Sequence, residues 1–385
     1  MAESVDIVIA GGGPVGAALA LGLRDSGLSV TLIEARTSGA IADDARSIAL
    51  AHGSRLILER LGVWGALASA STPIDCINIS QQGKFGRAEL HADEAGVPAL
   101  GYVTGYAALQ RALANALAQT PVRLLEGCIV ESVSGEAHGA TVGITAAGAR
   151  REMQARLVAI ADGGTQFELR HVKTRDYRQS ALVCDAVSEQ SHRNRAFERF
   201  TPEGPLALLP AARGWSVVWA ARPGNAHDLA ALDDAEFCRR LQTACGGAVG
   251  AVTAAGARQV FPLALRYATR PVAPRTLLIG NAAQTLHPVA GQGFNLGLRD
   301  AWELARAVLA HGENDPGGSA RLKAYFSQRR LDRIATILFT DTLIRLFCND
   351  IPLLRGAGGL GLVALGALPA AKNFLVQRMM YGARG

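Results

Sequence analysis

Aromatic residues and long apolar runs are both scarce in this sequence. Phenylalanine, tryptophan and tyrosine together make up 5% of the 385 residues. The uncharged stretch 356–371, near the end of the sequence, is shorter than the roughly 20 residues that a membrane-spanning helix needs, and five of its residues are glycine. We therefore expect that this stretch does not cross a bilayer and that any membrane contact is peripheral.

Cysteine is also sparse, and its spacing fits no metal or redox motif. The six cysteines lie far apart, at Cys76, Cys128, Cys184, Cys238, Cys245 and Cys348. None forms the C-x-x-C pair that clamps zinc, attaches haem or makes a redox disulfide, so we expect reduced core residues and no metal site. The acidic N-terminal residues carry no secretory or transit signal. These features predict a cytoplasmic protein, or one peripheral to the inner membrane.

Blocks of a single charge are missing as well. Lysine and arginine number 39 against 33 acidic residues, and the net charge of +6 is spread along the chain. The sequence lacks the basic, aromatic-interleaved patch that nucleic-acid-binding proteins present, so nucleic acid is not an expected partner. An apolar content of 49% over this length predicts two packed globular units of α/β character.

The first part of the chain has the pattern of a strand, a helix and a second strand. A short apolar run at 5–10 is followed by three glycines, a helical segment at 15–24 and an apolar run at 29–34. Residues 45–70 continue with helical periodicity, and residues 74–90 alternate as strands do. We expect the chain to leave the first domain at about residue 74.

The remaining segments predict two interleaved domains. An amphipathic helix at 106–119 and short strands at 123–162 return the chain to the first domain. Strand-like runs between 180 and 267 surround one expected helix at 233–242, which indicates a mostly antiparallel sheet. A third return begins with a strand at 276–279, followed by helices from residue 298 to the end. The predicted division is 1–73, 100–178 and 270–385 for the first domain, and 74–99 and 179–269 for the second.

A dinucleotide-binding fingerprint opens the sequence. Gly11, Gly13 and Gly16 form G-x-G-x-x-G between a strand and a helix, where the glycines allow a tight turn and a close approach to a pyrophosphate. Glu34 ends the second strand, where a carboxylate accepts hydrogen bonds from an adenosine ribose and disfavours a 2′-phosphate. The same pattern recurs at residues 356–361, but no clear strand precedes it and no acidic residue follows it, so we interpret that copy as a helix-packing feature.

Three segments together resemble the FAD-dependent aromatic hydroxylases of the para-hydroxybenzoate hydroxylase type. They are the fingerprint with Arg46, the segment Ala161-Asp162-Gly163, and residues 280–297, which read GNAAQTLHPVAGQGFNLG. The resemblance implies an α/β fold in which a Rossmann-like FAD-binding domain is interleaved with a mostly antiparallel-sheet substrate domain, with C-terminal helices. Two positions depart from the family pattern: Asn281 replaces the usual Asp, and Thr165 begins a stretch where the family has Ser.

The fingerprint and the resemblance together assign a set of cofactor contacts. Backbone at glycines and a proline can lie against the flavin, and polar side chains can bind its phosphates and hydroxyl groups. The predicted FAD-binding residues are Gly11, Gly13, Pro14, Val15, Gly16, Glu34, Ala35, Arg46, Gln110, Asp162, Gly280, Asn281, Pro288, Gly291, Gly293, Phe294 and Asn295. No catalytic side chain is assigned, because a His-Pro pair such as His287-Pro288 is more often structural.

Within that family, residues 280–297 are most similar to the ubiquinone-biosynthesis hydroxylases that act on 2-polyprenyl-6-methoxyphenol. Residues 204–210 and Trp219 resemble the middle domain of the same branch. The resemblance implies hydroxylation of a prenylated phenol to the 1,4-benzoquinol by O2 through a flavin C4a-hydroperoxide. It also implies NADPH or NADH as electron donor and other ubiquinone-biosynthesis enzymes as partners.

Other functions on the same scaffold stay open at this point. They are a sister ubiquinone hydroxylase, a prenyl reductase, a halogenase and a non-enzymatic prenyl-binding escort resembling the GDP-dissociation inhibitors. Trp215 and Trp219 do not form the paired-tryptophan motif of the halogenases. The segment from residue 356 to the end is expected either to lie against a membrane or partner, or to close the FAD-binding domain.

Overall fold

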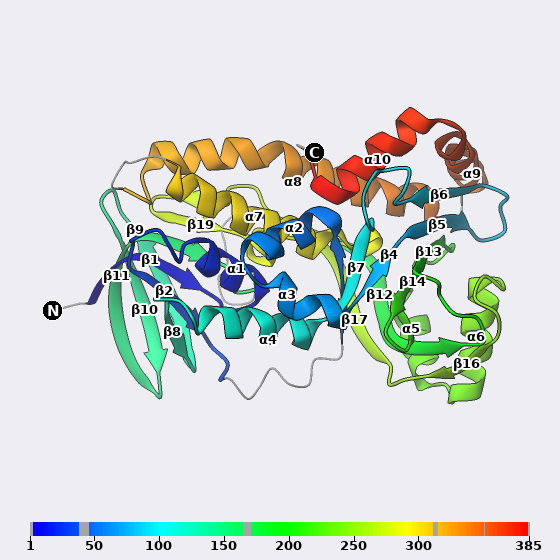
Figure 1. The fold of residues 1–385 in the computed structure, drawn as a ribbon, viewed down its shortest axis with the longest axis horizontal. Helices are drawn as coiled ribbons and strands as arrows, with labels where there is room; N and C mark the ends of the chain where they lie inside the picture. Colours follow the sequence, from blue (N-terminus) through cyan, green and yellow to red (C-terminus); the bar gives the residue numbers. More distant parts are fainter. Residues whose placement is uncertain (1–2, 38–45, 165–170, 311–314, 350, 384–385) are drawn as a thin grey trace.

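The computed structural model describes residues 3–37, 46–164, 171–310, 315–349 and 351–383. Figure 1 shows an elongated molecule with a parallel sheet and its helices at one end and an antiparallel sheet at the other. Long helices near the C-terminus run along the first of these halves, and the last two helices lie over the second. The α/β architecture expected from the sequence is confirmed.

A parallel sheet forms the centre of the first half. Its strand order is β18-β19-β11-β1-β2-β8, and the neighbours from β19 to β8 run parallel. β9 and β10 extend β11 as an antiparallel meander. The strands are β1 (Glu3–Ala10), β2 (Val30–Glu34), β8 (Arg123–Glu126), β9 (Cys128–Gly135), β10 (Ala140–Ala146), β11 (Ala149–Ile160), β18 (Val272–Ala273) and β19 (Thr276–Leu278).

The two faces of this sheet are covered differently. Ile7 and Ile9 of β1 are fully buried against a layer of helices, whereas Val8 and Ala10 face the meander of β9 and β10. Alternate residues of a strand point to opposite faces, so an apolar residue at every position is required when both faces are covered. The helices on the first face are α1 (Pro14–Gly22), α2 (His52–Arg60), α4 (Tyr106–Leu117) and α7 (Gln292–Leu309), with α8 (Ser319–Phe347) outside α7.

A second sheet of nine strands builds the other half. Its order is β20-β17-β12-β15-β14-β13-β5-β6 with β16 beside β12, and only the β13–β5 pair is parallel. One face packs on two short helices, α5 (Pro223–Ala231) and α6 (Asp234–Cys245). The strands are β5 (Cys76–Gln81), β6 (Arg87–His91), β12 (Val172–Ser188), β13 (Arg195–Phe200), β14 (Pro205–Ala211), β15 (Gly214–Ala221), β16 (Val252–Ala255), β17 (Gln259–Ala268) and β20 (Gln284–Thr285).

A small third sheet connects the halves, and here the expected helical segment at 45–70 is partly wrong. β3 (Ser47–Ala51) precedes α2 and pairs with β7 (Gly101–Gly105), which also pairs with β4 (Ser71–Ile74). The short elements α3 (Trp64–Leu67) and η2 (Ala68–Ala70) follow α2. The β3 residues form a strand because they pair with β7, about 50 residues later in the chain. Local periodicity does not reveal such a pairing.

Two further expectations for the second half need correction. The predicted single helix is two, because α5 starts with Pro223 at its first turn before α6 begins. The predicted boundary at residues 178 and 179 lies inside β12, a continuous 17-residue strand that enters the second sheet. The two halves are therefore joined by an unbroken strand and not by a linker.

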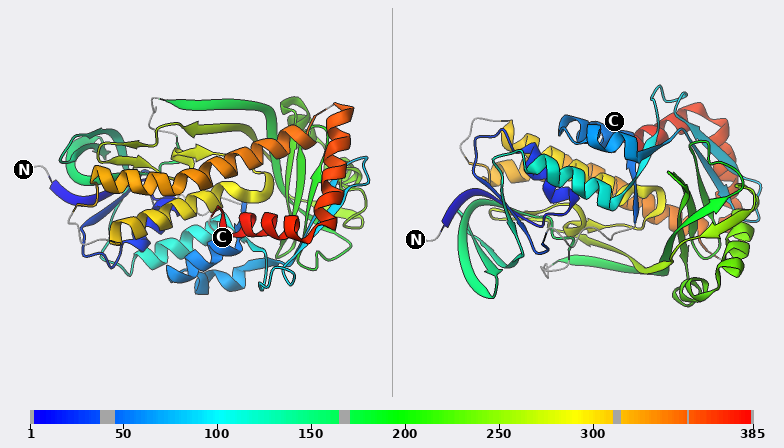
Figure 2. Two further views of the ribbon diagram at one scale, coloured as in Figure 1. Left: turned by 90° about the horizontal axis from the view of Figure 1, so that it is seen from above. Right: turned by 60° about the horizontal axis from the view of Figure 1, so that its bottom comes forward.

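The C-terminal helices bind the first half to the second. α7 and α8 lie side by side, and α9 (Pro352–Ala367) and α10 (Pro369–Tyr381) turn back across the edge of the second sheet, as both views in Figure 2 show. The second G-x-G-x-x-G copy lies within α9, where a Cβ on Gly358 would come 2.9 Å from the ring of Phe347. Close helix packing explains that glycine, as the sequence interpretation expected.

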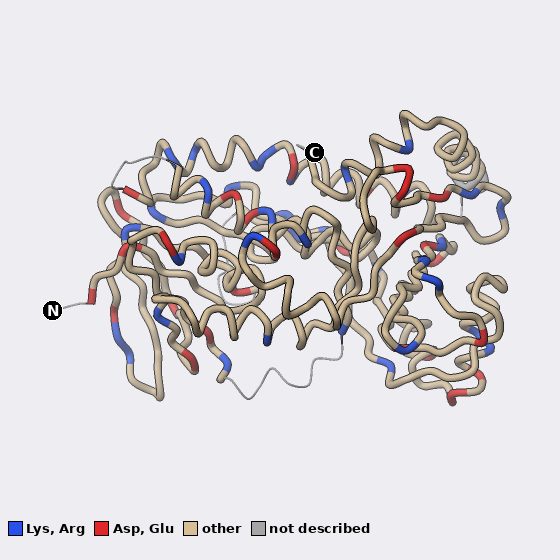
Figure 3. Tube along the Cα trace, in the orientation of Figure 1, with Lys and Arg blue, Asp and Glu red and all other residues tan. Residues whose placement is uncertain are grey.

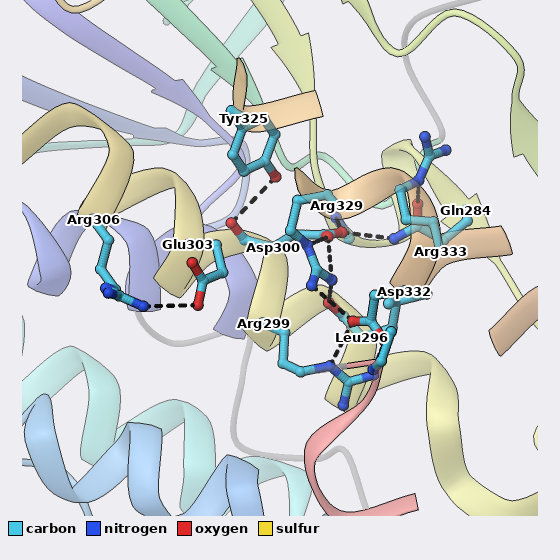
Figure 4. Close-up of polar contacts among 12 residues, drawn as sticks. Gln284, Leu296, Arg299, Asp300, Glu303, Arg306, Tyr325, Arg329, Asp332 and Arg333 are labelled. Carbon is cyan, nitrogen blue, oxygen red and sulfur yellow. Dashed lines mark hydrogen bonds and ion pairs between the residues drawn. The ribbon is translucent and has the colours of Figure 1, made fainter. Parts of the chain in front are cut away.

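A buried network of charged groups fastens α8 to α7 and to the segment before it (Figure 4). The carboxylate of Asp300 on α7 receives Arg329 Nη2 at 2.8 Å and Gln284 Nε2 at 2.6 Å. It also accepts the backbone amide of Gly280 at 3.2 Å. Burial of these charges is tolerated because both carboxylate oxygens of Asp300 accept hydrogen bonds. Since one of the donors is the amide of Gly280, the geometry of residues 280–297, which we call the 280 segment, depends on Asp300.

Asp332 on α8 extends this network to the C-terminus. Its Oδ2 lies 2.7 Å from Arg329 Nη1 and 2.9 Å from Arg299 Nε, and its Oδ1 accepts the amide of Ala383 at 2.8 Å. Burial opposes ionisation, but the two guanidinium groups hold the pKa of Asp332 below its ordinary value. Ala383, near the C-terminus, is thereby attached to the core.

We predict that Asp300→Asn lowers the free energy of unfolding by about 3–5 kcal/mol, because it leaves Arg329 buried without its full counter-charge. Urea unfolding of the purified protein measures the change. The control is Glu303→Gln, which breaks the more exposed 3.3 Å pair with Arg306 on the same helix and should change stability by less than about 1 kcal/mol. Equal losses in both variants would contradict the role given to Asp300.

Candidate cofactor site

The glycine turn between β1 and α1 is built around steric limits at two of its glycines. Gly11 has a φ of +111°, and a Cβ there would lie 2.5 Å from the carbonyl oxygen of Ala161. A Cβ on Gly16 would lie 1.9 Å from the carbonyl oxygen of Gly11. Any other residue at these positions would force the turn apart, which explains the spacing read from the sequence.

Gly13 differs from its neighbours because it faces open space. A Cβ placed there would meet no protein atom within 4 Å. Gly13 also occupies the N-cap position of α1, without a side-chain cap, and Pro14 and Val15 form the first turn. Free amides at a helix N-terminus favour an anion. The open side of Gly13 therefore fits a phosphate that approaches the backbone.

Glu34 lies directly beside this turn at the end of β2. Its Oε2 accepts the backbone amide of Gly12 at 2.7 Å, and its Oε1 accepts Arg36 N at 3.0 Å and Nε at 2.8 Å. Ala35 is exposed next to it. The sequence interpretation missed Gly12 and Arg36, although three consecutive glycines and an arginine two residues after the acid were visible. Since each carboxylate oxygen can accept two bonds, Glu34 keeps capacity for a ribose hydroxyl.

Gln110 contacts the same turn from α4. Its Nε2 donates to the carbonyl oxygen of Gly12 at 2.8 Å, while its Oε1 is buried without a hydrogen-bond partner in the structure. A buried acceptor without a donor is unfavourable unless a ligand supplies one. The residue predicted to contact the cofactor therefore presents a free acceptor beside the phosphate position.

The Asp-Gly segment and the 280 segment, far apart in the sequence, meet at this end of the sheet. Asp162 Oδ1 accepts the amide of Gly164 at 2.9 Å, and its Cα would lie 2.8 Å from a Cβ on Gly11. A Cβ on Gly164 would approach the carbonyl oxygen of Asn281 to 2.9 Å, and Asn281 itself is exposed. The departure noted at Thr165 lies outside the described residues.

The ends of β19 and α7 press against the helix of the glycine turn. The 3-10 turn η3 (Gly280–Ala282) begins at Gly280, whose φ is +60° and whose Cβ would lie 3.1 Å from Val15. A Cβ on Gly297 of α7 would lie 3.0 Å from both Val15 and Gly280 Cα. This three-way contact fixes the 280 segment against the phosphate-binding helix.

The loop before α7 carries an unusual backbone. Pro288 leads into the turn η4 (Val289–Gly291), in which Ala290 has a φ of 58° and Gly291 a φ of 61°. A left-handed conformation at alanine costs about 1–2 kcal/mol, so packing around the loop must hold it. Gly293 has open space where a Cβ would be, and Phe294 is partly buried against the helix layer. The loop thus presents bare backbone beside the first turn of α7.

Asn295 holds this loop in place. Its Oδ1 accepts Ala51 N at 2.8 Å and Ser54 Oγ at 2.6 Å, and its Nδ2 donates to Ala49 O at 3.0 Å and Gly291 O at 2.7 Å. These four bonds use the full capacity of the amide. The Asn295 side chain therefore has a positioning role, in which it ties the loop to β3 and α2, and the predicted FAD contact of Asn295 stays a prediction.

Arg46 lies between the two halves of the molecule. Its guanidinium carbon is 5.1 Å from the ring centroid of Tyr106 at the start of α4 and 5.7 Å from that of Phe261 on β17. Its carbonyl oxygen accepts the amide of Tyr106 at 2.8 Å. The residue is exposed, so an always-charged donor stands where both halves meet.

His287 is structural in this arrangement. It is fully buried, its Nδ1 accepts the amide of Val289 at 3.2 Å, and its Nε2 lies 3.2 Å from Gln179 Oε1. Burial lowers its pKa to about 3. The ring is therefore neutral at physiological pH and donates to Gln179 from Nε2.

These features fit FAD, and comparison with known proteins agrees. The family model described as "FAD binding domain" matches residues 4–339. A ubiquinone hydroxylase, UbiL, of Rhodospirillum rubrum is 33% identical over 97% of this chain and 89% of its own length. The chain belongs to the FAD-dependent hydroxylases of the ubiquinone-biosynthesis family. Its cofactor is FAD, with a reduced nicotinamide nucleotide as the family's usual electron donor, and it is an enzyme and not an escort.

Other relatives of this flavoprotein are of similar length. The 3-demethoxyubiquinol 3-hydroxylase of Escherichia coli is 32% identical over 94% of the chain and 95% of its own length. Among solved structures, the p-nitrophenol 4-monooxygenase PnpA of Pseudomonas putida has a TM-score of 0.80 at 18% identity, with full coverage of both chains. The structural likeness supports the fold, and the two sequence relatives support the family.

Among the residues that the structure describes, one group of side chains outside the flavin site has metal-ligand chemistry. Cys76, Glu89 and His91 on β5 and β6 place one ligand atom each within 4.8 Å of one another. His91 Nε2 lies 3.2 Å from Glu89 Oε2 and 3.9 Å from Cys76 Sγ. A hydrogen bond between histidine and carboxylate accounts for this pair without a metal ion.

We predict that Gly13→Ala weakens FAD binding at least about tenfold while the protein without FAD stays folded, because the new methyl group meets only the space assigned to the phosphates. FAD titration of the apoprotein measures the affinity, and thermal unfolding of the apoprotein measures stability. Gly65→Ala is the control, since Gly65 also has open space around it but lies in α3. Unchanged FAD affinity in Gly13→Ala would refute the phosphate position.

Proposed function

We propose that this enzyme hydroxylates a polyprenylated phenol, converting 2-polyprenyl-6-methoxyphenol to the 1,4-benzoquinol. Hydroxylation with FAD in ubiquinone biosynthesis is the activity of its family, and the names of its relatives include several ubiquinone hydroxylases. The substrate and the ring position are the part that we add. The resemblance of residues 280–297 to the hydroxylases of this substrate supports that choice.

The proposal rests on the face of the second sheet that α5 and α6 do not cover, which we call the free face. Opposite the face covered by α5 and α6, the cross-strand row of Val183, Val218 and Ala207 is only partly buried, and so is Phe261. An apolar surface left half-exposed in a folded protein indicates a binding site. Arg46 lies over Phe261 at one edge of this face, so the apolar surface adjoins the cofactor half.

The chain's own residues have positioning and shielding tasks in this reaction. Bound FAD, reduced by NADPH or NADH, supplies the activation of O2 for ring hydroxylation. Apolar side chains on the free face exclude water from the ring and hold a prenyl group by burial. The bare backbone of Ala290 and Gly291, held by Asn295, keeps the loop fixed while substrate enters and product leaves.

The decisive experiment supplies the holoenzyme with O2, NADPH or NADH, and a set of short-chain prenylated phenols and quinols. We predict hydroxylated product in a near 1:1 ratio to oxidised nicotinamide for 2-polyprenyl-6-methoxyphenol, and mainly hydrogen peroxide for unprenylated phenol, because water then reaches the flavin. Coupled hydroxylation of demethoxyubiquinol alone would instead place this enzyme at the step named for the Escherichia coli relative.

We further propose that α9 and α10 rest on the membrane that contains the polyprenyl substrate. No single described helix is long and apolar enough to cross a bilayer; α9 and α10 pass that test only as a pair bent by 98°. Leu360, Val363, Leu368 and Phe374 are nevertheless exposed, and so is Phe85 in the hairpin that packs on α9. We call these five residues the tail patch. Such a surface suits partial burial in a lipid interface.

The charges around the tail patch favour an anionic lipid surface. No acidic residue follows Asp350 in the sequence, whereas Arg378 lies on α10 beside Lys372, which pairs with Glu94 at 2.8 Å. Figure 3 shows that the coil of α9 is almost free of charged residues, while basic residues appear in the neighbouring hairpin and in α10. Basic residues near an anionic bilayer add to apolar burial.

We predict that the protein floats with vesicles of phosphatidylethanolamine and phosphatidylglycerol. The double change Leu360→Ser and Phe374→Ser should weaken this binding at least about tenfold, because two apolar side chains that enter the lipid interface are lost. The control is Leu309→Ser, an exposed leucine at the end of α7. Equal flotation of all variants would remove the membrane proposal and leave the hydroxylase assignment intact.

A further inference from the structure

Glu198 lies on β13, in the second sheet. On β13, Phe197 packs on Trp215 at 5.6 Å in the core beneath α5 and α6. Consecutive strand residues point to opposite faces, so Glu198 projects from the free face. Its cross-strand neighbours are Ala207 on β14 and Ile79 on β5. An acid therefore lies in an apolar row.

The carboxylate also lies against the loop before α7. The backbone amide of Ala290 is close enough to lower the pKa of this carboxylate. Beside it on the same face, Phe200 stacks on Phe347 with ring centroids 4.4 Å apart, and Val289 belongs to the same cluster. Glu198 thus lies where the second sheet meets the loop before α7, whose backbone adjoins the flavin site.

The environment of Glu198 is unfavourable for an acid without a ligand. Its Oε1 is shielded from solvent and has no hydrogen-bond partner in the structure. Burial raises its pKa to about 7, against the effect of the Ala290 amide, and Glu198 in turn helps to raise the pKa of the nearby Cys348 thiol. An unpaired buried acceptor costs about 1–3 kcal/mol, which an apolar side chain at this position would avoid.

A phenol supplies what is missing at this position. Its ring and prenyl chain match the apolar row around Glu198, and its hydroxyl group is a donor for the unpartnered Oε1. We propose that Glu198 binds the substrate directly, by accepting the hydrogen bond of the phenolic hydroxyl group. This assignment rests on the proposed function, because it requires a phenol in contact with the free face of the second sheet.

The test compares two ligands and one matched pair of variants. Binding of 2-farnesyl-6-methoxyphenol and of its O-methyl ether to the FAD-loaded enzyme is measured by the change in flavin absorbance. We predict that the wild-type enzyme binds the phenol about tenfold or more tightly than the ether, as expected for a shielded hydrogen bond to an acidic group. In Glu198→Leu and in Glu198→Met, the two ligands should bind within about threefold of each other.

The control for this comparison is Glu189→Leu. Glu189 is an exposed carboxylate in the same half of the molecule, beyond the end of β12, so its replacement should leave the preference for the phenol unchanged. Flavin content and thermal unfolding are measured for each variant. Because Glu198→Leu removes an unpaired buried acceptor, we expect its stability without substrate to equal or exceed that of the wild type.

The possible results separate the two proposals. A wild-type preference that survives in both Glu198 variants, or equal wild-type binding of phenol and ether, would overturn the role of Glu198 and leave the proposed function standing. A wild-type enzyme that binds neither ligand would overturn the substrate class and, with it, the role of Glu198. Loss of the preference only in the Glu198 variants would support both.

Discussion

The close contact of Gly280 and Gly297 with Val15 is the constraint on which the site depends. Residues from the N-terminal turn, the strand end at β19 and helix α7 come within van der Waals distance there, and a Cβ at either glycine would meet Val15 at 3.0–3.1 Å. Asp300 strengthens the contact by accepting the amide of Gly280. The turn assigned to the phosphates and the loop assigned to the flavin ring are thereby held at a fixed separation.

Three features join the two halves of the molecule near the site. The loop at Ala290 touches Glu198 on the substrate sheet, and Arg46 reaches Phe261 on that sheet from the cofactor half. β12 continues without a break from one half toward the other. Substrate bound on the free face, as proposed, would lie beside both the loop and Arg46.

The features that could be predicted from the sequence are those set by short-range spacing. The glycine turn and Glu34 lie within 24 residues and follow from steric rules at Gly11 and Gly16. Asn295 could not be interpreted in this way, because its partners Ala51 and Ser54 lie more than 240 residues earlier. In the folded protein, these partners and two backbone carbonyl groups occupy all four hydrogen bonds of its side-chain amide.

Neither Glu198 nor the strand β3 was predicted from the sequence, for a related reason. A glutamate within an alternating strand is ordinarily a solvent-facing residue, and only the packing of η4 and Phe347 on that face shields it. β3 had helical periodicity locally, and pairing with β7 decided otherwise. In both cases a long-range contact overrode the local pattern.

The most direct test of this account is a crystal structure of the protein with FAD bound. The account predicts the pyrophosphate against Gly13 and the first turn of α1, and the flavin ring beside the backbone of Ala290 to Gly293, with no shift of the contact between Val15, Gly280 and Gly297. An FAD molecule with its ring away from the loop before α7, or a displacement of α7 from α1 on binding, would contradict it.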